Sequence, residues 1–148
     1  MKKLLITLSV VLALLGVYVI VVGFSPYGES DVEGEIGVRV IDASGQAVID
    51  DTLPFHEDDT VFDVLNRHYD LTLTTYSSVA GRALLGIDSV ITDFANDFLY
   101  ITLHHPVWED GEIVDYDIEA AQSGIDGLPL RDGLIIVFTV TTVGGGSP

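Results

Sequence analysis

Two adjacent histidines lie close to the only tryptophan of the chain, in a stretch that could bind a ligand. His104 and His105 precede Trp108, and Tyr100 precedes them. Imidazole nitrogens bind metal ions, and aromatic rings can pack against a flat ligand such as a corrin-like ring. Adjacent residues of a strand point to opposite faces, so we do not expect the histidines to share one ion. These residues are the candidate ligand site, and a solvated strand end is the alternative.

The densest acidic cluster of the sequence follows this stretch. Carboxylates are hard oxygen ligands of the kind that Ca²⁺ prefers, so the cluster could form a calcium site. It does not match an EF-hand loop, because the position after Glu119 that would need glycine is Ala120. A solvated acidic loop is the simpler interpretation. The candidate metal ligands are Glu109, Asp110, Glu112, Asp115 and Asp117, and Glu119 completes the cluster.

Motifs for catalysis are absent from the sequence. The chain has no cysteine and no Gly-x-Ser-x-Gly motif, and no histidine stands at a recognisable spacing from Ser77 and Ser78. It also has no glycine-rich loop followed by a helix that would bind phosphate. We therefore expect a protein that is not an enzyme.

An uncharged run from Leu4 to Phe24 follows Lys2 and Lys3. A helix of this length is roughly 31 Å long, enough to cross a hydrocarbon core of about 30 Å. The lysines place the N-terminus in the cytoplasm and the rest of the chain outside the cell, as a single-pass protein of the cell membrane. The alternative is a secreted protein with a cleaved signal peptide, whose apolar region is usually shorter, about 7 to 15 residues.

The part beyond the anchor is strongly acidic. It carries four arginines and all 23 acidic residues, which gives a charge of 4 − 23 = −19. Such a charge would repel nucleic acid and anionic lipid, so neither is expected as a partner. Residues 25–34 are rich in Gly, Ser and acid and predict a linker, residues 35–143 predict one domain, and residues 144–148 predict a flexible tail.

The domain begins with the pattern of a hairpin followed by a helix. Residues 36–41 and 47–55 are predicted as antiparallel strands, because the Asp and Gly between them favour a tight reversal. Residues 60–69 are predicted as a short amphipathic helix, in which Thr60 and Asp63 form a variant of the capping box. Phe62 and Leu65 are expected to face the sheet.

The second half of the domain has the pattern of further strands. They are predicted at residues 71–76, 84–91, 98–104 and 134–143, and the last is apolar on both faces, as a central strand would be. Its Ile136 and Phe138 are expected to meet the helix. This order predicts an α+β fold, a single β-grasp-like domain in which a mixed sheet surrounds one short helix, behind an N-terminal transmembrane helix.

Three segments resemble the DUF4430 family of exported bacterial domains. They read TVFDVL at 60–65, GIDSV at 86–90 and LRDGLIIVF at 130–138. That family is similar to the C-terminal β-grasp domain of transcobalamin and intrinsic factor, which helps to enclose cobalamin. The resemblance implies a non-catalytic module for a cobalamin-like or other vitamin-type ligand.

The alternative function is a protein–protein interaction module at the cell surface, which would dock through a sheet edge or the acidic loop. A pocket lined by Tyr100 and Trp108 would favour ligand binding. An exposed strand edge without a cavity would favour the interaction module.

Overall fold

The computed structural model describes residues 32–77 and 81–143. The predicted anchor from Leu4 to Phe24 and the predicted tail lie outside the described residues. In the part that is described, no helix has the length and apolar character needed to cross a membrane.

The domain starts with the predicted hairpin of β1 (Gly34–Ile41) and β2 (Ala47–Phe55), which pair antiparallel. The Asp42 side chain organises the reversal, because its Oδ1 accepts hydrogen bonds from the backbone nitrogens of Ser44 (2.8 Å) and Gln46 (3.0 Å). Gly45 has a φ of +82°, which glycine adopts without steric cost. The hairpin prediction is confirmed.

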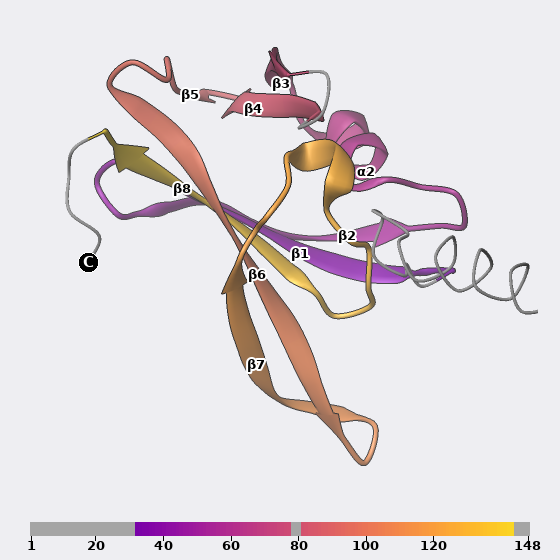
Figure 1. The fold of residues 1–148 in the computed structure, drawn as a ribbon. Helices are drawn as coiled ribbons and strands as arrows, with labels where there is room; N and C mark the ends of the chain where they lie inside the picture. The colour runs from indigo at the N-terminus through magenta and orange to yellow at the C-terminus, as the bar shows by residue number, and fades with distance from the viewer. Residues whose placement is uncertain (1–31, 78–80, 144–148) are drawn as a thin grey trace, which may run out of the picture.

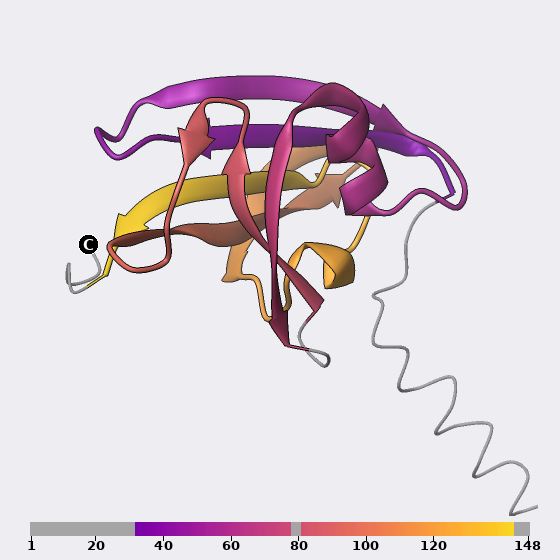
Figure 2. The same ribbon diagram turned by 90° about the horizontal axis from the view of Figure 1, so that it is seen from above.

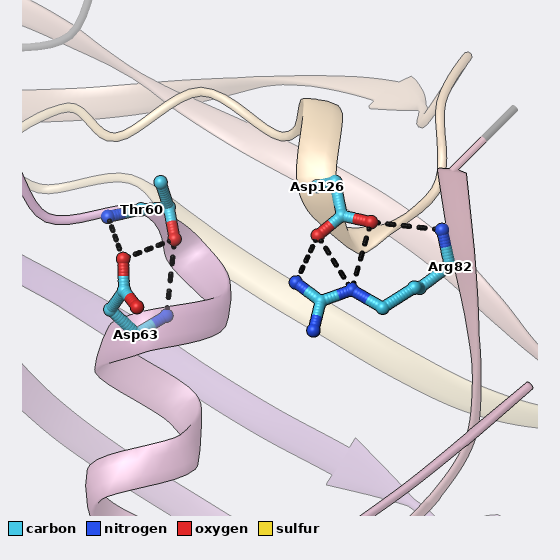
Figure 3. A network of polar contacts seen from close by, with 4 residues as sticks. All are labelled: Thr60, Asp63, Arg82 and Asp126. Carbon is cyan, nitrogen blue, oxygen red and sulfur yellow. Dashed lines mark hydrogen bonds and ion pairs between the residues drawn. The ribbon is translucent and has the colours of Figure 1, made fainter. Parts of the chain in front are cut away.

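The helix α2 (Val61–His68) follows, with the predicted capping box at its start. Thr60 Oγ1 accepts a hydrogen bond from the Asp63 backbone nitrogen (3.2 Å), and Asp63 Oδ2 accepts one from the Thr60 backbone nitrogen (2.9 Å). Figure 3 shows the reciprocal pair at the first turn. The box satisfies backbone donors that have no partner within the helix.

A small antiparallel sheet comes next, in the order β3-β4-β5. It contains β3 (Leu71–Ser77), β4 (Gly81–Ile87) and β5 (Val90–Ile91). The prediction of one continuous strand at 84–91 is wrong, because the chain reverses at Asp88, whose φ is +51°. This reversal divides the segment into β4 and β5, which pair with each other.

The large sheet is completed by β6 (Asp97–Glu109), β7 (Glu112–Ala120) and, after the short 3-10 helix η1 (Ile125–Gly127), β8 (Ile135–Thr142). Its order is β2-β1-β8-β6-β7. The pair β1–β8 is parallel, and the others are antiparallel. The central position predicted for the last strand is confirmed, and the domain is a mixed, sheet-dominated α+β fold with one α-helix among the described residues.

The acidic segment after Trp108 is a strand, so the prediction of a solvated loop there is wrong. β6 continues beyond His104 to Glu109, and β7 pairs with it in antiparallel register. The turn between them contains Asp110 and Gly111, with φ values of +53° and +84°. Two central residues with positive φ make the tight hairpin turn that suits the twist of the flanking strands.

The core lies between one face of the large sheet and the layer formed by α2, η1 and the small sheet. Figure 1 places these elements on the same side of the large sheet, and Figure 2 shows the strands of the small sheet running across those of the large one. Leu65, Ile136 and Phe138 are fully buried in the core, as predicted, whereas Phe62 is only partly buried and its ring lies against Arg82.

An arginine joins three parts of this covering layer. The backbone nitrogen of Arg82 in β4 donates to Asp126 Oδ2 in η1 (2.8 Å), and its Nε donates to Asp126 Oδ1 (3.0 Å). Its guanidinium carbon lies 3.8 Å from the ring centroid of Phe62 in α2. Figure 3 shows Arg82 and Asp126 beside the helix.

The other side of the large sheet is called the open face here. Its residues alternate with those that point into the core, and α2, η1 and the small sheet all lie on the opposite side (Figure 1). The open face is formed by Glu35, Gly37 and Arg39 of β1, Asp50 and Thr52 of β2, Ile135, Val137 and Thr139 of β8, Tyr100, Thr102 and His104 of β6, and Tyr116 and Ile118 of β7.

Candidate functional site

A pocket of about 370 Å³ lies on the open face. One side is built by the hairpin arm, defined as residues 105–117, where β6 and β7 continue past the last pairing of β6 with β8 at His104. In Figure 1 this arm projects beyond the rest of the sheet. The other side is built by β1, β2 and the turn before β8. The pocket therefore lies where the arm meets the body of the domain.

Two glycines and an isoleucine form the floor of the pocket. A Cβ atom at Gly37 would lie 3.0 Å from Cγ1 of Ile135, and one at Gly133 would lie 2.8 Å from Cδ1 of Ile113. Gly133 also has a φ of +75°, which disfavours any other residue there. Both positions need the small size of glycine, because a Cβ atom at either one would press against side chains of the pocket lining.

The wall on the hairpin arm is aromatic and apolar. It consists of Trp108 from β6 and Ile113 and Tyr116 from β7. Ile113 and Tyr116 are three residues apart, so in a regular strand they would point to opposite faces. A β-bulge brings them to the same face, because Val107 pairs with Asp115 while the next residue, Trp108, pairs with Ile113. The bulge thereby places all three wall residues on the pocket.

The opposite wall is acidic. Asp132 Oδ1 accepts a hydrogen bond from the backbone nitrogen of Glu35 (2.9 Å), and the Glu35 carbonyl accepts one from the Gly133 backbone nitrogen (2.9 Å). These bonds hold the turn before β8 against the start of β1. They bring Glu35 and Asp132, which are far apart in sequence, to one side of the pocket.

The lining includes two further acidic residues whose carboxylates form defined contacts. Asp50 forms an ion pair with Arg39 of the neighbouring strand (3.0 Å), and Asp51 Oδ2 accepts a hydrogen bond from the Tyr69 hydroxyl (2.9 Å). Burial raises the pKa of Tyr69, and the hydrogen bond to Asp51 adds to this effect. Asp50 therefore lines the pocket as part of an ion pair, whereas the carboxylate of Asp51, which pairs with the core-facing Val38, is directed toward Tyr69 on the other side of the sheet.

The four residues of the predicted ligand site do not come together. Trp108 lines the pocket and its side chain is 48% exposed, whereas Tyr100 is 44% exposed on the open face and is not among the lining residues. His104 also lies on the open face, beside Thr102. His105 points to the other face and its Nε2 lies 2.8 Å from Glu119 Oε1. The expectation that the two histidines lie on opposite faces is confirmed.

The surroundings of His104 favour its neutral form. Burial lowers the pKa of His104, and the positive charge of Arg39 on the same face lowers it further. The neutral ring could bind a metal ion, yet the nearby guanidinium disfavours a cation at this point.

The predicted acidic metal site is spread along both strands of the arm and its turn. Glu109, Asp110 and Glu112 stand at the turn, and Asp115 and Asp117 pair with Val107 and His105 on the side away from the pocket. Within residues 32–77 and 81–143, no group of three or more His, Cys, Asp or Glu side chains is placed to hold a metal ion. The calcium site stays a prediction that the geometry of these residues does not support.

The sequence interpretation missed every lining residue of the pocket except Trp108, among them Glu35, Ile113, Tyr116 and Asp132. A signal for the hairpin arm was present in Asp110-Gly111, since Asp-Gly between alternating residues is a strong hairpin pattern. No local signal could have joined Glu35 to Asp132, because their contact depends on the parallel pairing of β1 and β8.

Comparisons with known proteins add a general likeness of fold. No protein-family model matches the chain, and no curated protein sequence matches it either. One solved structure with a similar fold is that of a protein from Ruminococcus gnavus described as a putative metal binding protein. The TM-score is 0.48 with 20% sequence identity, and the match covers 74% of this chain and 98% of the other. At these values the likeness carries no functional argument, so the site is interpreted from its own geometry.

Proposed function

We propose that the chain is a non-catalytic binding module, anchored in the cell membrane by the segment from Leu4 to Phe24 and displayed outside the cell. Its domain holds a small ligand in the pocket on the open face. The observation that carries this proposal is the pocket itself, whose volume of about 370 Å³ falls within the usual range for ligand sites of about 300 to 1,000 Å³.

The composition of the pocket supports binding rather than catalysis. Trp108, Ile113 and Tyr116 offer apolar and aromatic surface, and the remaining wall offers carboxylates and Thr52. A half-exposed tryptophan on a strand is a rigid group that buries a large area when a ligand covers it. No Ser–His or Cys–His pair lines the pocket among the described residues, so the lining lacks the usual activated nucleophile.

The β-grasp assignment of the domain is part of the same proposal. It is supported by the strand order β2-β1-β8-β6-β7, in which the first and last strands run parallel at the centre and one helix covers a face. Together with the resemblance to the DUF4430 family, this assignment makes a cobalamin-like or other vitamin-type molecule the first ligand class to test.

The test uses the fluorescence of Trp108, because it is the only tryptophan of the chain. The full-length protein in detergent micelles would be titrated with cobalamins and other vitamins, and Ca²⁺ and Zn²⁺ would be screened by thermal shift. A ligand that binds only the native state raises the apparent melting temperature. We expect at least one organic ligand to change both the emission of Trp108 and the melting temperature.

A variant separates binding in the pocket from binding elsewhere. Trp108→Ala should weaken binding of that ligand at least tenfold, measured by calorimetry, with far-UV circular dichroism unchanged because the side chain is half-exposed. Tyr100→Ala on the same face but outside the pocket lining is the control and should keep the affinity. Equal loss in both variants, or no loss in either, would contradict the pocket as the binding site.

The alternative function, a protein-interaction module, is favoured by one observation. β7 is an edge strand of the large sheet, and its Val114 and Ile118 are 53% and 64% exposed. An exposed edge can accept a strand from a partner protein. Loss of a surface-protein complex in Ile118→Lys, combined with no response of Trp108 to any small molecule, would favour this alternative.

A further inference from the structure

We infer that the pocket on the open face selects a ligand that carries an organic ammonium group. This inference rests on the proposed function and names the chemistry that the ligand must have. It combines three features of the pocket: an aromatic wall, an acidic wall, and a floor without side chains at Gly37 and Gly133.

The aromatic wall suits a cation. An ammonium group placed over the face of tryptophan or tyrosine is attracted by the negative charge of the ring face, and tryptophan gives the strongest attraction. Trp108 and Tyr116 both line the pocket, and Trp108 keeps about half of its surface exposed. The methyl or methylene groups around such an ammonium would also pack against Ile113, the cross-strand partner of Trp108 in the same wall.

The opposite wall sets the sign of the charge that can enter. Every charged residue in the lining is acidic: Glu35, Asp50, Asp51 and Asp132. Of these, Asp50 is paired with Arg39 and Asp51 holds Tyr69. Glu35 lies at the start of β1, where its backbone nitrogen donates a hydrogen bond to Asp132 Oδ1, so both residues belong to the acidic wall. An anionic ligand would be repelled by this wall.

An organic cation fits the pocket better than a bare metal ion does. The described carboxylates are not gathered into a group of three that could coordinate one ion. Three of the lining residues, Trp108, Ile113 and Ile135, offer no oxygen or nitrogen ligand that a hard cation prefers. An organic ammonium would contact both walls of the pocket, because its positive charge attracts the carboxylates of the acidic wall and its carbon groups pack against the rings of the aromatic wall.

The experiment compares a cation with a neutral molecule of the same shape. The full-length protein in detergent micelles would be titrated with choline and with 3,3-dimethylbutan-1-ol, in which carbon replaces the quaternary nitrogen. Trp108 emission reports the binding of both. We expect choline to bind at least tenfold more tightly, with an affinity that falls as salt increases, since salt screens the attraction of exposed carboxylates.

Three variants test whether the pocket causes this preference. Glu35→Gln removes one charge from the acidic wall and should weaken choline binding about three- to tenfold while leaving the neutral analogue unchanged. Gly37→Val fills the floor and should abolish the binding of both, and its melting temperature shows whether the fold survives. Glu112→Gln is the matched control, because it removes the same charge at the arm's turn, outside the lining, and should leave both affinities unchanged.

The outcomes separate this inference from the proposed function. Equal or tighter binding of the neutral analogue, or equal effects of Glu35→Gln and Glu112→Gln, would overturn the preference for a cation while leaving the pocket as a ligand site. No response of Trp108 to choline at millimolar concentration would also overturn it. A failure of the proposed function itself would appear as no response to any ligand of the vitamin screen.

Discussion

Asp59 and Arg67 form the ion pair that ties the loop before α2 to the last turn of the helix. The two nitrogens Nη1 and Nη2 of Arg67 each lie 2.7 Å from a carboxylate oxygen of Asp59, and Asp59 also accepts a hydrogen bond from the His56 backbone nitrogen (2.8 Å). The hydrogen bonds from Arg67 lower the pKa of Asp59 to about 2, with a smaller contribution from His56. A bidentate arginine–carboxylate ion pair of this kind has a better defined geometry than most ion pairs at protein surfaces.

This pair predicts a pH dependence of stability in the acid range. The folded-state pKa of Asp59 lies below its ordinary value of 3.8, so its charged form stabilises the native state. That stabilisation is present above about pH 5 and is lost as the pH falls toward about 2. Asp59→Asn should therefore unfold at a lower urea concentration than the wild type at pH 6, and the difference should shrink by pH 3.

The control for this measurement is Asp110→Asn, which removes one carboxylate at the turn of the hairpin arm, where Asn tolerates the positive φ. It leaves the Asp59–Arg67 ion pair intact, and its urea midpoint is measured at the same two pH values. A constant difference between wild type and Asp59→Asn from pH 6 to pH 3 would show that the ion pair does not titrate as expected.

Among the elements, α2 and the large sheet contribute buried side chains to the same core. Leu65 of the helix and Phe138 of β8 are fully buried in the same apolar cluster. Leu65→Ala and Phe138→Ala should each lower the free energy of unfolding by about 2 to 5 kcal/mol, because each leaves a cavity.

Urea denaturation followed by circular dichroism measures this loss. Val114→Ala on the exposed side of β7 is the control, with an expected change in the free energy of unfolding within about 0.5 kcal/mol. Losses below about 1 kcal/mol at both core positions would mean that the two elements do not form the core contact.

The sequence predicted those elements whose signals are local. The hairpin of β1 and β2 depends on the short reversal after Ile41, and α2 depends on the pair Thr60 and Asp63, so each signal lies within a few residues. β8 was predicted as central because Ile136, Val137 and Phe138 are apolar on both faces, and all three are buried. These patterns needed no knowledge of the rest of the chain.

β7 was not predicted as a strand, because its acidic composition is typical of a solvated loop. It is an edge strand, so its carboxylates at Asp115, Asp117 and Glu119 remain in water while its backbone still pairs with β6. Charged residues on an edge also oppose unwanted pairing with other chains. The Asp110-Gly111 pair is a hairpin signal, and it favours a strand over a solvated loop despite the acidic composition of the segment.

The candidate site was predictable only in part, and for a physical reason. Trp108 stood out as the single tryptophan and lines the pocket. The acidic wall depends on the parallel pairing of β1 with β8, which brings Glu35 next to Asp132. The position of Ile113 depends on the bulge, which changes the register by one residue. Neither the pairing nor the register could be read from the local pattern.

At the scale of the whole molecule, the pocket lies close to the point where the domain joins the predicted linker. Glu35 belongs to the acidic wall, and the linker predicted at residues 25–34 ends just before it. A chain of ten residues spans at most about 36 Å when fully extended. If the anchor crosses the membrane, the start of β1 and the pocket beside it stay near the membrane surface.

The anchor itself gives the last prediction. If the segment from Leu4 to Phe24 remains in the membrane, the protein should sediment with membranes, resist extraction by carbonate, and still begin at or near Met1. In that case a C-terminal tag should also be cut by protease added to intact cells, because lysines before an apolar span favour a cytoplasmic N-terminus. Replacing Leu12 and Leu15 by Arg should prevent stable insertion, since each arginine at the centre of a membrane helix costs about 2.5 to 3.5 kcal/mol or more. The matched control is Leu12→Ala with Leu15→Ala, which keeps the segment uncharged and should leave the protein in the membrane. Recovery of the wild-type protein from the medium with a new N-terminus near Phe24 would instead identify a cleaved signal peptide and a secreted domain.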